Sequence, residues 1–263
     1  MAENAAIRLD KVSRAFGGGR QRVLAVQDVS MELPPNSIAS IVGESGSGKT
    51  TLARMMLCLL RPTSGAVCYR GTDIGTYDAR QRRDYWRSVQ GIFQDPYASF
   101  NQFFRVRKIL NDAFNLWPAR PSRSEREDRI SAALEMVNLK AGEVLDRYPF
   151  ELSGGQGQRL MIARVFIIRP AVLIADEPTS MIDACSRASI LEALIRLREE
   201  QGTSILFVTH DMGLAYYVSE TLYIMSQGRI VESGPAEQVM ESPRDPYTRR
   251  LLADVPRLHQ AWL

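Results

Sequence analysis

The sequence is poor in cysteine and histidine. Its 263 residues include three cysteines, Cys58, Cys68 and Cys185, and two histidines, His210 and His259. The cysteines stand far apart and form no C-x-x-C pair or cluster with histidine, which argues against a zinc site or a disulfide scaffold and suits a reducing cytosol. A chain of this length buries a core without disulfide bonds.

Long hydrophobic runs and an excess of one charge are also lacking. The longest apolar stretches, such as Met55 to Leu60 and Ala171 to Ala175, are far shorter than the ~20 residues of a membrane-spanning helix. Met1 to Asp10 lacks the basic and apolar regions of a secretory signal, so we expect no leader. Lys and Arg number 33 against 30 Asp and Glu, and we expect no nucleic-acid partner. The only basic cluster, which we expect to be a solvated face, is Arg80, Arg82, Arg83 and Arg87.

Hydrophobic periodicity predicts an α/β protein. Apolar and polar residues alternate at Ile7 and Leu9 and again from Leu24 to Leu33, on either side of a glycine turn. This pattern predicts antiparallel strands with one face exposed to solvent. Buried strands and helices are then expected to alternate, which implies a parallel core. The expected strands are Ile38 to Val42, Val89 to Phe93, Val172 to Ala175 and Ile205 to Val208, and the expected helices are Lys49 to Leu60 and Ala184 to Glu199.

The pattern changes between Asn101 and Phe150, where helical periodicity surrounds a charged linker, Arg120 to Arg129. We interpret this segment as an inserted helical subdomain. After His210 we expect a short helix, two strands at Thr221 to Met225 and Arg229 to Val231, and a helical tail. The expected organisation is one domain over 1–263, with the α/β core and an antiparallel β subdomain in 1–100 and 151–234, the helical subdomain in 101–150 and the tail in 235–263.

The segment Gly43 to Thr50 fits the phosphate-loop pattern G-x-x-x-x-G-K-[ST], with a strand before it and a helix after it. By this chain's composition, one such match arises by chance with a probability on the order of 0.002, so a Gly/Ser turn that happens to precede a lysine is disfavoured. Glycines let N–H groups surround a phosphate, Lys49 is expected to neutralise β- and γ-oxygens, and Thr50 to bind Mg²⁺. The expected nucleotide-binding residues are Gly43, Ser45, Gly46, Ser47, Gly48, Lys49, Thr50 and Thr51. The loop alone fits a kinase, a GTPase or another ATPase.

The apolar strand Ala171 to Ala175 ends in Asp176 and Glu177. Beside a phosphate loop, this arrangement favours a magnesium-binding Asp176 and a Glu177 that polarises the attacking water. The alternative is a helix cap followed by Pro178 and Thr179.

A serine and two glycines in Leu152 to Gln156 are expected to open a helix and to form a second anion nest, although Ser-Gly-Gly also occurs in plain loops. This string resembles the signature motif of ABC-transporter nucleotide-binding domains, and it lies upstream of the acidic strand as in that family. The resemblance implies a P-loop NTPase core with an antiparallel β subdomain and an inserted helical subdomain.

Four further residues fit the same family. Gln94 resembles the glutamine that senses Mg²⁺ and the γ-phosphate, and Asp183 resembles the D-loop aspartate. His210 resembles the switch histidine that contacts the γ-phosphate, and Phe16 stands where an aromatic residue stacks on adenine. Taken alone, His210 would be read as a structural loop residue and Phe16 as a core aromatic.

Within the family, the strings Gln94 to Asn101 and Ser242 to Thr248 resemble the ATP-binding subunits of oligopeptide, dipeptide and nickel importers. Three residues depart from that pattern: Asp245 replaces a histidine, Gln102 a proline, and Gly157 a basic or polar residue. Gly157 should weaken its helix by roughly 1 kcal/mol relative to alanine.

The resemblance implies an ATPase that works as a head-to-tail dimer and binds ATP and Mg²⁺. The chain's own nucleotide would contact Lys49, Thr50, Gln94, Asp176, Glu177 and His210, and the partner's nucleotide would contact the signature residues Ser153, Gly155 and Gln156. The implied metal ligands are Thr50, Gln94 and Asp176. Closure and hydrolysis would power uptake of a solute such as a peptide, nickel or an oligosaccharide.

The implied partners are a second ATP-binding subunit, identical or related, two transmembrane permease subunits and, indirectly, an extracytoplasmic solute-binding protein. The implied location is the cytoplasmic face of the membrane. Tyr97 and Phe100 follow Gln94 and are candidate anchors for a permease helix, the alternative being ordinary packing.

Two other functions compete with transport. A soluble ABC-type ATPase that works on DNA would need a coiled-coil or zinc-hook insertion, for which Asn101 to Phe150 is too short. A nucleotide kinase would need an acceptor site and would not need Leu152 to Gln156.

Overall fold

The computed structural model describes residues 6–17, 22–180, 182 and 184–253. The chain divides into two compact units. Unit 1 contains residues 1–77 and 206–263, and unit 2 contains residues 78–205.

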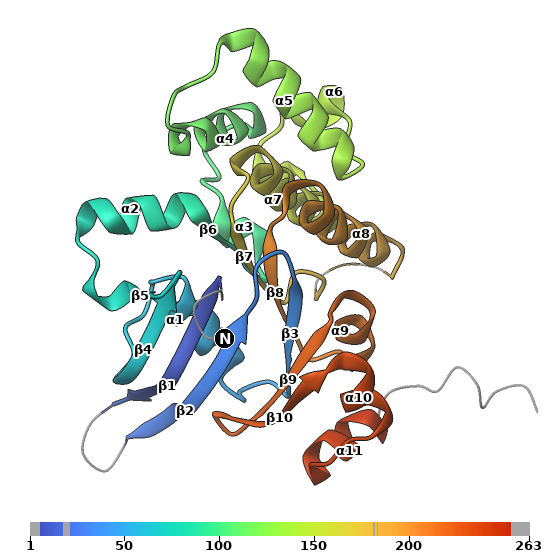
Figure 1. Ribbon diagram of the computed structural model, residues 1–263. Helices are drawn as coiled ribbons and strands as arrows, with labels where there is room; N and C mark the ends of the chain where they lie inside the picture. The colour runs from blue at the N-terminus through green and yellow to red at the C-terminus, as the bar shows by residue number, and fades with distance from the viewer. Residues whose placement is uncertain (1–5, 18–21, 181, 183, 254–263) are drawn as a thin grey trace, which may run out of the picture. The chain divides into compact units, whose positions relative to one another are not determined.

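Unit 1 contains an antiparallel sheet with the strand order β2-β1-β4-β5 (Figure 1). Its strands are β1 (Ile7–Phe16), β2 (Val23–Leu33), β4 (Ser64–Tyr69) and β5 (Thr72–Asp73). The register pairs Ile7 with Leu33 and Phe16 with Val23, and Leu9 is buried like Ile7. The antiparallel strands predicted from alternation in the first forty residues are therefore confirmed, whereas β4 and β5 were not predicted.

The second set of strands in unit 1 has the order β10-β9-β3-β8. These are β3 (Ile38–Val42), β8 (Ser204–Thr209), which carries the chain from unit 2 into unit 1, β9 (Thr221–Ser226) and β10 (Arg229–Pro235). β3 runs parallel to β9, and β10 is antiparallel to β9. All five residues of β3 are buried, as its apolar run predicts.

Short helices complete unit 1: α1 (Lys49–Met56), η2 (Ile74–Thr76), α9 (Met212–Val218), α10 (Ala236–Glu241) and α11 (Pro246–Ala253). The expected helix from Lys49 to Leu60 is shorter, because Cys58 adopts a left-handed conformation with φ 56°. One buried hydrophobic cluster joins Val42 and Leu222 to Val239 of α10, and Tyr247 of α11 packs against it. The tail helices are thus part of the core of unit 1.

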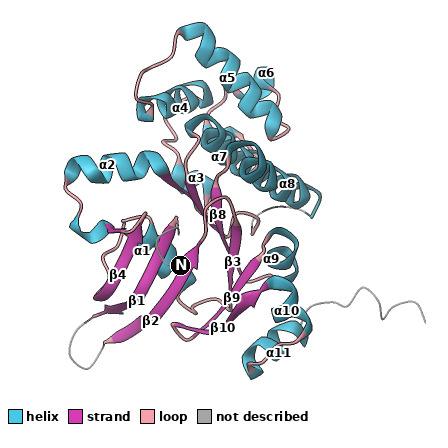
Figure 2. Cartoon of the chain, in the orientation of Figure 1, coloured by secondary structure: helices cyan, strands magenta, loops and turns pink. Residues whose placement is uncertain are grey.

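Unit 2 is mostly helical (Figure 2). Its parallel strands β6 (Val89–Ile92) and β7 (Val172–Asp176) pair Ile92 with Ala175. Its helices are α2 (Ala79–Ser88), α3 (Pro96–Ser99), α4 (Val106–Ala113), η3 (Phe114–Leu116), α5 (Arg123–Met136), α6 (Ala141–Val144), η4 (Pro149–Glu151), α7 (Gly154–Ile168) and α8 (Ala184–Gln201). The helical segment expected between Asn101 and Phe150 is confirmed.

The charged linker predicted at Arg120 to Arg129 is wrong, because helix α5 begins inside it at Arg123. The Ser122 hydroxyl caps this helix, and the carboxylate of Glu127 accepts a hydrogen bond from Arg123 one turn away at 3.1 Å. Oppositely charged residues at i and i+4 stabilise a helix, so a charged segment can be helical as well as an extended, solvated linker. The buried Leu134 further along anchors α5 in the unit.

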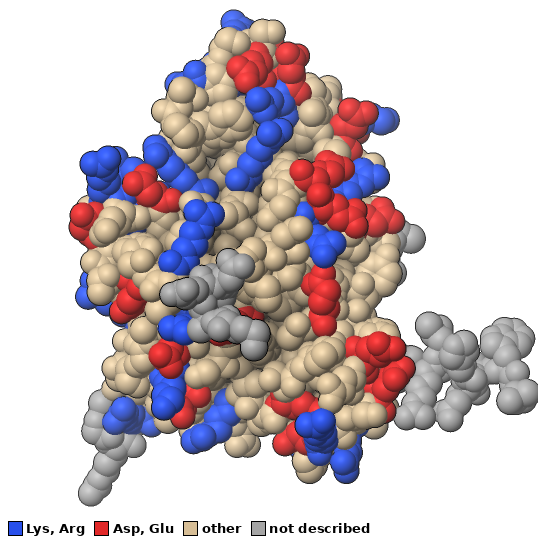
Figure 3. Space-filling model, in the orientation of Figure 1, with Lys and Arg blue, Asp and Glu red and all other residues tan. Residues whose placement is uncertain are grey.

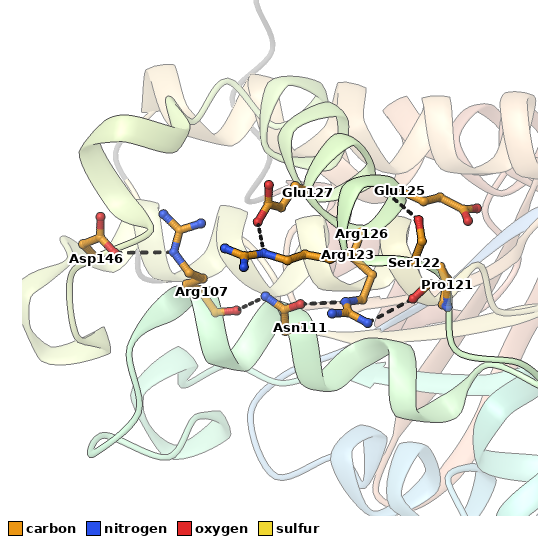
Figure 4. A network of polar contacts seen from close by, with 9 residues as sticks. All are labelled: Arg107, Asn111, Pro121, Ser122, Arg123, Glu125, Arg126, Glu127 and Asp146. Carbon is orange, nitrogen blue, oxygen red and sulfur yellow. Dashed lines mark hydrogen bonds and ion pairs between the residues drawn. The ribbon is translucent and has the colours of Figure 1, made fainter.

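Polar contacts connect the helices of this segment (Figure 4). Arg126 of α5 donates to the side-chain oxygen of Asn111 in α4 at 3.1 Å, and Asn111 donates to the carbonyl of Arg107 at 2.9 Å. Arg107 in turn pairs with Asp146 at 3.5 Å. These contacts join α4, α5 and the chain after α6.

Charges of both signs are interspersed on the face drawn in Figure 3. Arg80 and Arg83 on α2 are exposed, in agreement with the predicted solvated face, whereas Arg82 and Arg87 are half-buried. Among the described helices, none combines the length and the apolar character that a membrane crossing requires.

Candidate nucleotide-binding site

The phosphate loop connects β3 to α1 in unit 1. Two of its glycines are required because other backbone atoms lie too close to leave room for a side chain. A Cβ on Gly43 would lie 2.1 Å from the carbonyl oxygen of Met225. Gly48 has φ 107°, and its Cβ would lie 2.3 Å from the carbonyl oxygen of Ala25. Any other residue would clash at these positions, and Gly48 also needs the conformational freedom of glycine.

The loop forms a cradle that fits an anion. Lys49 is only 7% exposed, and its Nζ donates to the carbonyls of Gly43 at 2.7 Å and Glu44 at 2.9 Å. Within the described chain, no side chain caps the first turn of α1, and the buried Ser47 Oγ has no hydrogen-bond partner. Uncapped N–H groups at a positive helix end, an orphaned hydroxyl and a lysine suit a phosphate chain.

The other phosphate-loop residues predicted to contact nucleotide are accessible. Ser45, Gly46 and Thr50 are exposed, and Thr51 is half-buried. Gly46 has φ 82°, in the left-handed region. Their roles stay predictions.

Unit 1 also carries His210 and Phe16. His210 follows β8 and is exposed, and the next residue, Asp211, caps α9 through a hydrogen bond from the Leu214 amide at 3.0 Å. Phe16 ends β1 and is 40% exposed, which argues against a core role. The Arg14 guanidinium lies 4.8 Å from the centre of its ring. The predicted contacts of His210 and Phe16 with nucleotide stay predictions.

In unit 2, Asp176 and Glu177 lie at the end of β7. Asp176 is 4% exposed, and Glu177 has φ 52°, a left-handed conformation that is uncommon for a residue with a side chain. The Ser180 amide and hydroxyl both donate to the Glu177 carbonyl, at 3.3 and 3.1 Å. These contacts form a turn, and no helix starts at Pro178, so the helix-cap alternative is not supported.

Gln94 lies at the same sheet edge as the two carboxylates. Ile92 on β6 pairs with Ala175 on the parallel β7, so Gln94 and Glu177 each follow that pair by two residues. The carboxyl ends of adjacent parallel strands face the same edge, where α/β proteins bind ligands. Gln94 is exposed there. Asp183 lies outside the described residues.

The signature string begins helix α7 in unit 2, as predicted. The hydroxyl of Ser153 accepts a hydrogen bond from the Gln156 amide at 3.2 Å, and the Gln156 side chain accepts one from the Ser153 amide at 3.0 Å. This is a capping box. The Ser153 hydroxyl keeps its hydrogen for donation to an anion, and Gly155 in the first turn carries no side chain that could block one.

Sequence reasoning missed how the signature helix is attached to the segment around Gln94. Gln158 is fully buried and donates to the Gln94 carbonyl at 2.8 Å. A Cβ on Gly157 would lie 3.1 Å from Cβ of Pro96, so a small residue fits best at this position. The available signal for Gln158 was its position one turn after Gly154, on the same helix face.

Tyr97 makes a third link, because its hydroxyl donates to the Leu152 carbonyl at 2.8 Å. Its side chain is 38% exposed, whereas Phe100 is buried at 8% exposure. The packing alternative is therefore confirmed for Phe100.

Comparisons with known proteins identify the family to which the sequence is similar. The family model described as ABC transporter matches residues 26–180. The chain is 37% identical over 249 residues to the Di/tripeptide transport ATP-binding protein DppF of Pseudomonas aeruginosa, covering 95% of this chain and 76% of that protein. It is 35% identical over 251 residues to the Oligopeptide transport ATP-binding protein OppF of Streptococcus mutans, covering 95% of this chain and 81% of that one.

Solved structures are similar too. The dimeric structure of MJ0796, a bacterial ABC transporter cassette, matches with a TM-score of 0.80 and 27% identity over 88% of this chain and 98% of that one. A post-hydrolysis state of MJ0796 bound to ADP and Pi matches with a TM-score of 0.79 and 26% identity over the same shares.

Proposed function

Because this chain belongs to the ABC transporter family, we propose that it is the ATP-binding and ATP-hydrolysing subunit of a membrane importer for peptides. The observation that carries the proposal is the phosphate loop with its uncapped α1, buried Lys49 and orphaned Ser47 hydroxyl. The relatives' names, which specify di/tripeptide and oligopeptide transport, support peptides over nickel or oligosaccharides. They do not favour an ABC-type ATPase outside transport.

The roles of the chain's own groups follow from their chemistry. Lys49 would hold the β- and γ-phosphates, Glu177 would polarise the attacking water, and His210 and Gln94 would contact the γ-phosphate. Phe16 would stack on adenine. Thr50, Gln94 and Asp176 would hold Mg²⁺, which supplies charge neutralisation at the phosphates.

Ser153, Gly155 and Gln156 of the signature, with Asp183 nearby in sequence, would complete the nucleotide site of a second ATP-binding subunit. The dimeric state of the MJ0796 structure supports such pairing. Each closed dimer would then hold nucleotide between the loop of one chain and the signature of the other, and hydrolysis would release them.

We further propose that the pair docks on two transmembrane permease subunits at the cytoplasmic face of the membrane and serves an extracytoplasmic solute-binding protein through them. The chain would act as a single ABC ATP-binding domain over 1–263, with its helical subdomain in 101–150 and its tail in 235–263.

The test is Glu177→Gln. An amide cannot act as a base, so ATP should still bind while steady-state hydrolysis falls at least a hundredfold and an ATP-bound dimer accumulates. Size-exclusion chromatography with ATP measures the dimer, and a phosphate-release assay measures turnover. Glu135→Gln, which removes an exposed carboxylate at the end of α5, is the control. Hydrolysis by Glu177→Gln at the rate of the unmodified chain would remove the catalytic assignment.

A further inference from the structure

The string Ser242 to Thr248 has no part in the proposed ATPase mechanism, yet it reaches the phosphate loop. In unit 1, the hydroxyl of Tyr247 accepts a hydrogen bond from the backbone N–H of Glu44 at 3.0 Å. Glu44 is the second residue of the loop that starts at Gly43. The C-terminal tail is therefore bonded to the first peptide of the phosphate loop.

That peptide is also bonded at its other end. The carbonyl of Gly43 belongs to the same peptide group as the N–H of Glu44, and it accepts a hydrogen bond from Nζ of Lys49 at 2.7 Å. One peptide group thus lies between the Lys49 ammonium and the Tyr247 hydroxyl. Hydrogen bonds in such a chain polarise and strengthen one another, and both ends fix the orientation of the peptide plane. Tyr247 and Lys49 are thus connected through one peptide group, and Lys49 is held in addition by the Glu44 carbonyl at 2.9 Å.

Tyr247 is itself held from two sides. Its ring packs against the hydrophobic cluster that contains Val42 and Leu222, in the strands beside the loop. Its amide donates to the side chain of Asp245 at 2.8 Å. The Asp245 carboxylate thereby closes the turn that starts α11.

The turn is fastened to β10 by Glu232. Its carboxylate accepts hydrogen bonds from the amides of Arg244 at 2.8 Å and Asp245 at 3.1 Å. Burial raises the pKa of Glu232, but the hydrogen bonds from these two amides and the positive charge of Arg244 lower it, so that the pKa lies below its ordinary value. These contacts fix the turn from Arg244 to Tyr247, so that the hydroxyl of Tyr247 is presented to the loop at a defined place.

We propose that Tyr247 is a positioning residue for nucleotide binding, which holds the Gly43–Glu44 peptide and through it the Lys49 ammonium in the orientation that receives the phosphates. This inference rests on the proposed function, because it assumes that the loop binds ATP. It assigns the C-terminal string a role in the nucleotide site, with a nucleoside triphosphate as the ligand.

Tyr247→Phe removes only the hydroxyl, and Tyr223→Phe is its matched control. Tyr223 lies on β9 of the same unit, and its hydroxyl donates to the carbonyl of Glu32 on β2 at 2.8 Å and accepts from the Glu32 amide at 3.3 Å. Tyr247→Phe loses one neutral hydrogen bond and Tyr223→Phe loses two, so Tyr247→Phe should melt about 2 °C lower than the unmodified chain and Tyr223→Phe at least as much lower. Only Tyr247→Phe should bind ATP about fivefold more weakly in a fluorescent-nucleotide titration.

The outcomes are distinct. Equal ATP affinity in the two variants and the unmodified chain would overturn the inference and leave Tyr247 with a structural role alone. Equal weakening in both variants would overturn it as well, because the loss would then follow general stability. Failure of the unmodified chain to bind ATP would instead refute the proposed function. An ¹⁵N spectrum adds a second measurement, in which the Glu44 amide should shift in Tyr247→Phe and not in Tyr223→Phe.

Discussion

The first turns of α1 and α7 both lie in glycine-rich strings, with the glycines before α1 and inside the first turn of α7, yet the two turns satisfy their N–H groups differently. α1 starts after Gly48 with no side-chain cap in the described chain, whereas α7 starts after Ser153 and is closed by the capping box with Gln156. Neither helix has an acidic residue in its first turn, so both keep a positive end that attracts an anion.

This difference in capping indicates which of the two turns can bind an anion within a single chain. The α1 turn has a buried lysine and no side-chain cap in the described chain, so it can bind phosphates by itself. The α7 turn is satisfied by its own side chains, so it is stable while no partner is bound. Ser153 has only a hydroxyl hydrogen left to offer, which suits a contact made on dimer closure.

Lys49→Ala should have the largest effect and should be confined to the α1 turn. Losing two charge-assisted contacts with the phosphates would cost about 3 kcal/mol, or more than a hundredfold in ATP affinity. Nucleotide titration measures this loss, with Lys140→Ala as the control, because Lys140 is exposed and pairs only with Glu143 among the ion pairs of the described chain. Tight ATP binding by Lys49→Ala would mean that α1 does not hold the phosphates.

Ser153→Arg should give the opposite pattern. A long cation at the start of α7 cannot fit a closed interface, so ATP affinity should stay within about twofold while ATP-driven dimerisation and hydrolysis fall at least tenfold. Ser153→Asn separates this effect from the cap, because asparagine caps as well as serine. If Ser153→Arg lost ATP binding in the monomer, the assignment of α7 to the partner's nucleotide would fail.

Both helix starts could be predicted from the sequence alone. Gly43 to Thr50 and Leu152 to Gln156 were identified because their chemistry depends on residue types at fixed local spacing. The strands β3, β6 and β7 were located because buried apolar runs are local too.

The rest depends on contacts between segments that are distant in the sequence. The bond from Tyr247 to Glu44 joins residues 203 positions apart, and the bond from Gln158 to Gln94 joins residues 64 apart. No periodicity encodes such pairs. The charged residues after Arg120 were wrongly interpreted as a linker. Oppositely charged residues at i and i+4 stabilise a helix, but in the sequence they look the same as a solvated linker.

Gly157→Ala should have a smaller effect, on the attachment of α7 to the segment around Gln94. Alanine favours a helix by about 1 kcal/mol over glycine, but the new Cβ would lie 3.1 Å from the buried Pro96. Pro96 has a rigid ring, so we expect overpacking to prevail and the melting temperature to fall by about 2–4 °C. Gly142→Ala in α6 is the control, since its Cβ would meet nothing within 4 Å, and it should not destabilise the chain. A higher melting temperature for Gly157→Ala would show that Pro96 moves to accommodate the new Cβ.

Tyr97→Phe should have the smallest effect. It removes the hydroxyl that donates to the Leu152 carbonyl, directly before the cap of α7. Losing one neutral hydrogen bond of about 1 kcal/mol should lower the melting temperature by about 2 °C and weaken ATP-driven dimerisation about threefold, with ATP affinity in the monomer unchanged. Tyr217→Phe is the control, because Tyr217 is 64% exposed on α9.

Tyr97→Ala then separates the hydroxyl from the ring. If the exposed ring anchors a permease helix, the phenylalanine variant should assemble with the membrane subunits like the unmodified chain, and the alanine variant should assemble less well. Pull-down from membranes that contain the permease measures assembly, and dimerisation with ATP measures the signature turn. Equal assembly of both variants would leave Tyr97 as a link within unit 2 and place the permease contact elsewhere. Unchanged dimerisation in Tyr97→Phe would show that the capping box alone positions the α7 turn.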